Sequence, residues 1–121
     1  MSAQGLFLAI YKGSKDNPRM KAWNAMSEAE RGAKMQQGVA AWKAWVEKHK
    51  DAIVEMGGPL GKTKAIDAQG VTDISNNLTG FTVIRAASQD EAAKMFEKHP
   101  HFTIFPGENV EVMPVLAIPA G

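Results

Sequence analysis

The sequence predicts an α+β domain in which a four-stranded antiparallel sheet carries two helices. Four strand-like apolar runs and two runs of helical spacing alternate in the order strand, helix, strand, strand, helix, strand. The chain has 121 residues, which is enough for one domain over 1–121. Its 45% hydrophobic and 22% charged residues are ordinary values for a globular protein.

The first strand is predicted over 6–12. Both alternating sets of side chains are apolar there, which is typical of a strand in the middle of a sheet. The next segment, 13–19, is rich in Gly, Ser, Asn and Pro and predicts a loop. Trp23 is expected to lie in the loop that runs on from this segment to the first helix, and loops of about fourteen residues in small domains often serve as lids or binding loops.

The first helix is predicted to open at Ser27, which forms a capping box with Glu30. Its apolar face is expected to contain Met35, Val39, Trp42, Val46, His49, Ile53 and Met56. Gly57-Gly58-Pro59 is expected to end the helix, because glycine and proline follow helix ends. On this pattern Trp42 belongs to the core, while Trp45 lies beside the apolar face and is partly exposed.

Four further elements complete the predicted domain. A strand is expected over 60–67, and a β-branched and aromatic run predicts another over 81–86. A second capping box at 88–91 opens a helix that Pro100 ends, with His99 in its last turn. The last strand is predicted over 110–116, and its proline indicates an edge position.

This order of elements defines a ferredoxin-like β-α-β-β-α-β fold, in which both helices cover one face of the sheet. Leu6, Leu8 and Ile10 point to one side of the first strand and Phe7, Ala9 and Tyr11 to the other, so both faces are apolar and the helices leave one without cover. A second copy of the sheet is the natural cover. We therefore expect a homodimer formed by sheet-to-sheet packing.

Composition excludes several classes of function. The formal net charge is +1 and no basic cluster occurs, which argues against a nucleic-acid partner. There is no cysteine, so disulfides, thiolate metal sites and cysteine nucleophiles are excluded. The apolar run 6–11 is too short for a signal peptide or a membrane helix, and we expect a cytoplasmic protein without a membrane partner. The segment 57–63 is not a phosphate loop, because its first required glycine is Met56.

Four segments resemble a known family, and they are 6–13, 42–60, 88–101 and 110–114. They contain an apolar first strand, a helix followed by Gly-Gly-Pro, a Ser-Gln-Asp-Glu-Ala helix start with His-Pro-His, and a closing Val-Glu-Val-Met-Pro. In this they are similar to the YciI-like (YCII-related) branch of the dimeric α+β barrel superfamily. The resemblance implies a ferredoxin-like subunit, a dimeric α+β barrel and a ligand pocket, in a family whose members mostly have no assigned reaction.

One subgroup of that family places a histidine near the start of the first long helix. The equivalent position here falls near Ala41 or Trp42, so His49 is a different residue. The Asp-Gly-Pro-Phe motif of a subgroup is also absent, and 77–81 reads Asn-Leu-Thr-Gly-Phe instead. The resemblance therefore does not carry over the elimination or hydrolysis chemistry of that subgroup.

The candidate catalytic residues are His49 and His99, because both lie on predicted apolar helix faces that cover the same sheet. Two imidazoles in one interior would form a general acid/base pair. The alternative interpretation is a buried structural histidine and a favourable cation at a helix end. His99-Pro100-His101 resembles a two-ligand metal motif, but no third ligand is selected by spacing, and no metal site is predicted.

The candidate ligand-binding residues surround a pocket at one end of the sheet, closed by the two loops before the first helix and the last strand. They are Arg85, Tyr11, Trp23, His101 and Phe102. Arg85 is the candidate anion anchor if its side of the strand is interior, and otherwise it extends to water.

Two functions remain open at this point. One is a small dimeric enzyme that uses histidine acid/base chemistry on a small metabolite. The other is a non-catalytic domain that binds a small molecule. No cofactor motif is present, so none is predicted, although heme binding among proteins of similar fold is a lesser alternative.

Overall fold

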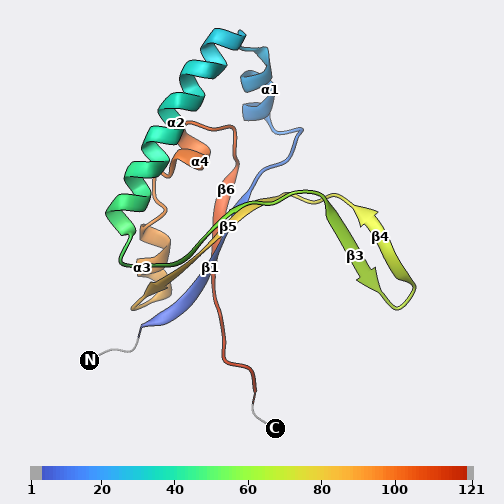
Figure 1. Ribbon diagram of the computed structural model, residues 1–121, viewed down its shortest axis with the longest axis vertical. Helices are drawn as coiled ribbons and strands as arrows, with labels where there is room; N and C mark the ends of the chain where they lie inside the picture. Colours follow the sequence, from blue (N-terminus) through green and yellow to red (C-terminus); the bar gives the residue numbers. More distant parts are fainter. Residues whose placement is uncertain (1–3, 120–121) are drawn as a thin grey trace.

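The structure, a computed structural model that describes residues 4–119, is built around a four-stranded antiparallel sheet (Figure 1). Its elements are β1 (Gly5–Lys12), α1 (Pro18–Ala25), α2 (Glu28–His49), β2 (Ile53–Pro59), β3 (Thr63–Asp67), β4 (Gly70–Ile74), β5 (Leu78–Ala86), α3 (Gln89–Lys94), α4 (Pro100–Thr103) and β6 (Asn109–Pro114). The strand order β2-β5-β1-β6 is that of a ferredoxin-like fold, which confirms the predicted fold class. No helix within 4–119 is long and apolar enough to cross a membrane.

β1 lies in the middle of the sheet, between β5 and β6, as its apolar sequence predicts. Its odd-numbered residues from Phe7 to Tyr11 are buried beneath the helices, and its even-numbered residues from Leu6 to Ile10 are half-buried on the other side. We call this second side the open face. β6 is an edge strand, as Pro114 predicts.

The core joins the sheet to helices α2 and α3. It consists of Phe7, Ala9, Tyr11, Trp45, Ile84, Ala86, Ala92 and Phe96. Trp45 comes from α2 and Ala92 from α3, so the two helices cover the same face of the sheet. Trp45 is thus the buried tryptophan of α2, whereas Trp42 is only partly buried, the reverse of the prediction.

The first helix is shorter than predicted. α2 ends at His49, and the segment expected to continue it to Met56 forms strand β2 instead. The β-branched Ile53 favours an extended backbone, and β5 supplies partners for the backbone groups of this segment. Gly57 has a φ of 68° in an irregular stretch of β2, where a Cβ atom would overlap the carbonyl of Phe81. Gly57 therefore allows a bulge in a strand and does not mark the end of a helix.

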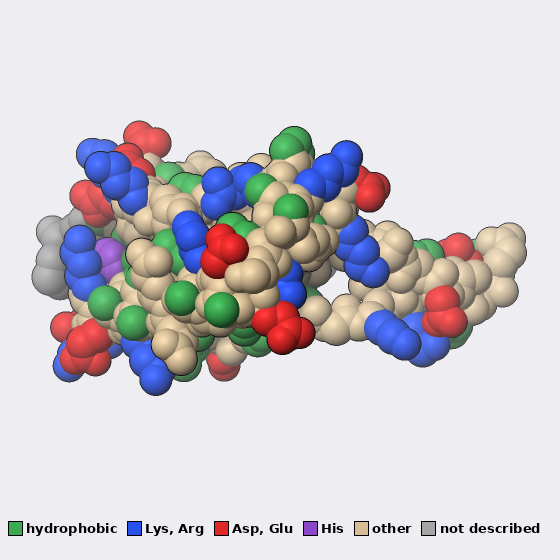
Figure 2. Space-filling model, turned by 90° about the horizontal axis from the view of Figure 1, so that it is seen from above, with side chains coloured by type: hydrophobic (Ala, Val, Ile, Leu, Met, Phe, Trp, Pro, Cys, Tyr) green, Lys and Arg blue, Asp and Glu red, His purple; other side chains and the backbone are tan. Residues whose placement is uncertain are grey.

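The strand predicted over 60–67 is present as β3, but it does not belong to the main sheet, so its expected place in the fold is wrong. β3 pairs with β4 in a separate two-stranded hairpin, 63–74, which we call the arm. β4 is absent from the predicted elements. The arm projects beyond the ends of β2 and β5 and forms the separate lobe seen in the space-filling view (Figures 1 and 2). Its apolar pair Ile66 and Val71 is exposed.

The long loop predicted after the first strand contains a helix. α1 begins after Asn17, whose side-chain oxygen accepts the backbone amide of Met20 at 2.9 Å, and Pro18 occupies the first turn. Asn followed by Pro is a helix-start signal that was readable from the sequence. Trp23 therefore lies on α1, where its ring is 6.1 Å from that of Phe105, centroid to centroid.

The second helix ends earlier than predicted. α3 covers Gln89–Lys94, and Pro100 begins α4 instead of ending a helix. Lys98 adopts a φ of 58°, and His99 is extended because the residue before a proline is disfavoured in the helical region. His99 therefore caps α4, and His101 lies inside this short helix.

Candidate functional site

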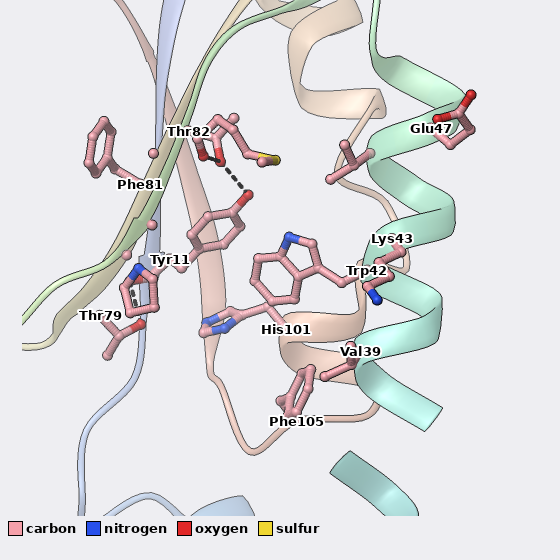
Figure 3. A pocket seen from close by; sticks show the side chains of 16 residues that line it. Tyr11, Val39, Trp42, Lys43, Glu47, Thr79, Phe81, Thr82, His101 and Phe105 are labelled. Carbon is pink, nitrogen blue, oxygen red and sulfur yellow. Dashed lines mark hydrogen bonds between the residues drawn. The ribbon is translucent and has the colours of Figure 1, made fainter. Parts of the chain in front are cut away.

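A cavity of about 800 Å³ lies between α2 and strands β1, β2 and β5. We call it the pocket (Figure 3). Its wall consists of Tyr11, Val39, Trp42, Lys43, Val46, Glu47, 56–59, 79–82, His101 and Phe105. Most of this wall is apolar, and a few polar groups converge at the end where Tyr11, Thr82 and His101 meet. Ligand sites in proteins commonly have this composition.

His101 lies in α4, and a hydrogen bond to β1 holds its ring at the wall of the pocket. Its Nε2 lies 2.9 Å from the carbonyl oxygen of Lys12, and because a carbonyl only accepts, Nε2 carries the proton and donates. In the neutral ring the lone pair is then on Nδ1. Burial lowers the pKa of His101, although backbone carbonyls of Lys12 and Asn109 oppose this effect. The imidazole is therefore neutral near pH 7 and able to accept a proton.

Tyr11 provides a second polar group beside His101, with ring centroids 5.4 Å apart. Its hydroxyl lies 2.8 Å from Thr82 Oγ1, and Thr82 donates in turn to the carbonyl of Met56 at 2.9 Å (Figure 3). Since the single Thr82 proton is used there, the Tyr11 hydroxyl donates to Thr82. Burial raises the pKa of Tyr11, so the phenol stays protonated and keeps lone pairs for a ligand donor.

His99 lies behind the wall and is fully buried. Its Nδ1 accepts the backbone amide of His101 at 3.0 Å, which places the proton of the neutral ring on Nε2. That Nε2 finds no hydrogen-bond partner within residues 4–119. The rings of Trp42 and Trp45 stand nearly edge-on to it at 4.5 and 4.8 Å, centroid to centroid. Burial and the neighbouring imidazoles lower the pKa of His99 to about 3, so this ring is neutral.

Two of the predicted site residues, Tyr11 and His101, line the pocket together. The other five lie outside its wall. His49 is at the end of α2 beside Trp45, at 5.1 Å between ring centroids, and the ring of His99 lies 4.8 Å from the same tryptophan. The imidazoles of His49 and His99 therefore do not share this cavity.

The remaining predicted residues are spread over three elements. Arg85 is exposed on β5, and it is paired with Leu6 on the open face, away from the pocket. Trp23 lies on α1 and contacts the segment that contains Phe105. Phe102 is half-buried on α4 and is not part of the wall.

Sequence reasoning missed Trp42, Lys43 and Glu47 as wall residues, because the helical pattern assigned Trp42 to the core. Trp45 takes that place instead, and its indole N–H donates to the carbonyl of Met95 at 2.7 Å. The Gly-Gly-Pro step was a usable signal, since residues without large side chains on a strand leave room for a cavity. Within 4–119 no group of three His, Asp or Glu side chains is arranged to hold a metal ion.

The fold and the site together define a ferredoxin-like α+β domain with an apolar pocket between its first long helix and its sheet. Among solved structures it is similar to 5-chloro-2-hydroxyhydroquinone dehydrochlorinase from Burkholderia phenoliruptrix AC1100, in complex with 2,5-dihydroxybenzoquinone. The match has a TM-score of 0.52 and 22% identity, and it covers 89% of this chain and 90% of the other. At this identity the likeness shows the fold. No protein-family model and no curated protein matches the chain, so the YciI-like resemblance stays a prediction.

Proposed function

We propose that the chain is a small enzyme that binds a planar, mostly apolar metabolite in the pocket and uses His101 as a general base. The observation that carries the proposal is the bond from His101 Nε2 to the Lys12 carbonyl, which leaves Nδ1 as the basic nitrogen. A base at the wall of a largely apolar cavity is poised to remove a proton from a bound molecule.

The same contacts would stabilise the protonated base. When Nδ1 takes a proton, the positive imidazolium keeps its Nε2–H bond to the Lys12 carbonyl, which is strengthened by the charge. Tyr11 accepts a hydrogen bond from a ligand hydroxyl, and the chain through Thr82 to the Met56 carbonyl fixes its orientation. His99 supports this arrangement by accepting the His101 amide, and it acts as a positioning residue.

The reaction class that fits is proton transfer on a hydroxylated ring or on an enolic carbon, as in isomerisation or elimination. The similar solved structure supports this choice, because that protein is a dehydrochlorinase and holds a dihydroxybenzoquinone. Its 22% identity leaves this chain's own substrate to be identified by experiment.

The test is a panel of hydroxylated benzenes, benzoates and quinones, followed by binding and turnover. Binding is measured by tryptophan fluorescence, since Trp42 is part of the wall, and product by mass spectrometry. His101→Gln should reduce turnover by about 10²–10⁴-fold with little change in binding. His49→Gln, the same substitution outside the pocket, should leave turnover unchanged. Equal turnover in the two variants would refute the role of His101.

A non-catalytic binding domain is the second candidate, and the largely apolar wall favours it, since apolar contacts bind without reacting. It predicts that ligands raise the melting temperature by an amount that follows their concentration, with no product formed. Ligand stabilisation without product over the whole panel would select this function.

We further propose that the functional unit is a homodimer joined through the open face. Leu8 is paired with Val83 on one side and Met113 on the other, so an apolar row crosses the middle of this face. Light scattering should give about twice the 13.1 kDa of one chain. Leu8→Glu should yield monomers, whereas Met35→Glu on the exposed part of α2 should not. A monomeric wild-type protein at micromolar concentration would refute the dimer.

A further inference from the structure

The charged side chains at the pocket wall are Lys43 and Glu47, which lie one turn apart on α2. Figure 3 places Lys43 next to Trp42 on α2, across the cavity from the strands. All other side chains of the wall are neutral, since His101 is uncharged near pH 7. Lys43 and Glu47 therefore decide whether the pocket favours an anionic or a cationic ligand.

Glu47 already has a partner. Its carboxylate accepts from Lys50 Nζ at 3.1 Å, on the outer surface of the helix. Lys43 forms no ion pair with any residue of the described range 4–119. The ammonium of Lys43 is thus the free charge at the wall, and a cationic ligand would be repelled there while an anionic ligand would gain a partner.

Two aromatic rings of the wall lie close enough together for a single-ring ligand to contact both. Trp42 and Tyr11 lie 5.0 Å apart, centroid to centroid, so one planar ring can contact both. Lys43 follows Trp42 in the sequence, and its flexible four-carbon stem can bring the ammonium to a substituent of that ring. Arg85, the other candidate anion anchor, is on the opposite face of the sheet.

We infer that the pocket selects aromatic or quinonoid anions, with the anionic substituent paired to Lys43 and a hydroxyl or enolic oxygen at the Tyr11–His101 end. This inference rests on the proposed pocket function and adds the charge of its substrate. The step involved is non-covalent recognition, and the base chemistry of His101 does not depend on it.

Three planar probes of matching shape test the inferred preference for anions, namely para-hydroxybenzoate (an anion), para-hydroxybenzamide (neutral) and para-hydroxybenzamidine (a cation). The wild-type protein should bind the anion about two- to fivefold more tightly than the neutral amide, as expected for a partly exposed ion pair. It should bind the cation most weakly. Lys43→Met keeps most of the length of the side chain without its charge and should abolish the preference for the anion over the amide. Lys43→Arg should retain it.

Lys34→Met is the matched control, because Lys34 is an exposed lysine of the same helix outside the wall. If Lys34→Met removes the preference as fully as Lys43→Met, the effect belongs to net charge and the inference is overturned. If the three probes bind the wild-type protein equally well, the inferred preference for anions is wrong, while the proposal that the pocket binds such ligands is still supported. If none of them binds, even at millimolar concentration, the proposed pocket function fails together with this inference.

Discussion

Gly107 is the position at which a single methyl group should disturb both the fold and the proposed site. A Cβ atom there would overlap Cε1 and Nε2 of the His101 ring and would lie 2.5 Å from the His101 carbonyl oxygen. The Gly107 amide also donates to that carbonyl at 2.9 Å, which ties the two backbones together. The backbone of Gly107 does not adopt a positive φ, so the conflict is one of space rather than of conformation.

The expected cost has two parts. Overpacking a buried contact of this kind destabilises by about 1–3 kcal/mol. If the ring moves away, the bond from His101 Nε2 to the Lys12 carbonyl is lost, which adds about 1 kcal/mol. Gly107→Ala should therefore lower the free energy of unfolding by about 2–4 kcal/mol and reduce turnover of any substrate that depends on His101.

Urea unfolding measures the first effect, and the same fluorescence and product assays measure the second. Gly32→Ala is the control, because Gly32 lies inside α2 with no atom within 4 Å of its added Cβ. That variant should be more stable than wild type by about 1 kcal/mol, since alanine favours helix over glycine. A Gly107→Ala protein that is as stable as wild type and fully active would refute the argued role of the His101 contact.

Three other outcomes are expected. His99 has a pKa of about 3 when folded and near 6.5 when unfolded, so only the unfolded chain gains a proton as pH falls through this range, and stability should decline below pH 6.5. His99→Asn, which can still cap α4, should reduce that decline in urea titrations between pH 7 and 4. Tyr11→Phe should cost about 1 kcal/mol in urea unfolding, because Thr82 keeps its bond to Met56, and should weaken binding of hydroxylated ligands seen by fluorescence. Replacing the arm, 63–74, by two glycines should leave the melting temperature and ligand binding nearly unchanged in calorimetry, because β3 and β4 pair only with each other.

The parts of the fold that could be predicted are those whose signals are local. Ser27 and Glu30 form the predicted capping box, and Ser88 accepts the amide of Glu91 at the start of α3. The apolar runs of β1 and β5 form the two central strands, where both faces of the sheet need apolar residues. These segments specify their own structure, so no knowledge of distant partners was required.

A prediction from sequence fails where one pattern of apolar residues fits both a helix and a strand. Ile53 and Met56 continue the helical spacing of α2, but they also fit an extended strand, and pairing with β5 decides between the two. That partner is about thirty residues away in the sequence, and the helical pattern carries no trace of it. β4 was missed for a different reason, because all of its residues are exposed and a strand without a buried face has no alternating pattern of apolar and polar residues.

The types of residue at the site could be predicted from the sequence, but the directions in which their side chains point could not. Histidines at 99 and 101 were both candidates, and a backbone turn at Lys98 and Pro100 decides which ring meets the cavity. His99 turns into the core beside Trp45, and His101 turns to the wall beside Tyr11.

The pocket itself follows from small residues on the strands that face α2. Gly58 is paired with Phe81, and Pro59 with Gly80, so glycine and proline occupy adjoining positions on β2 and β5, and Gly80 in turn is paired with Tyr11 of β1. At these positions the sheet offers few side chains to fill the space under α2, and Trp42 borders a cavity instead of a core. Tyr11 therefore keeps one side of its ring uncovered by the sheet. The Gly-Gly-Pro step that resembles a helix end in the sequence is what opens the site in the structure.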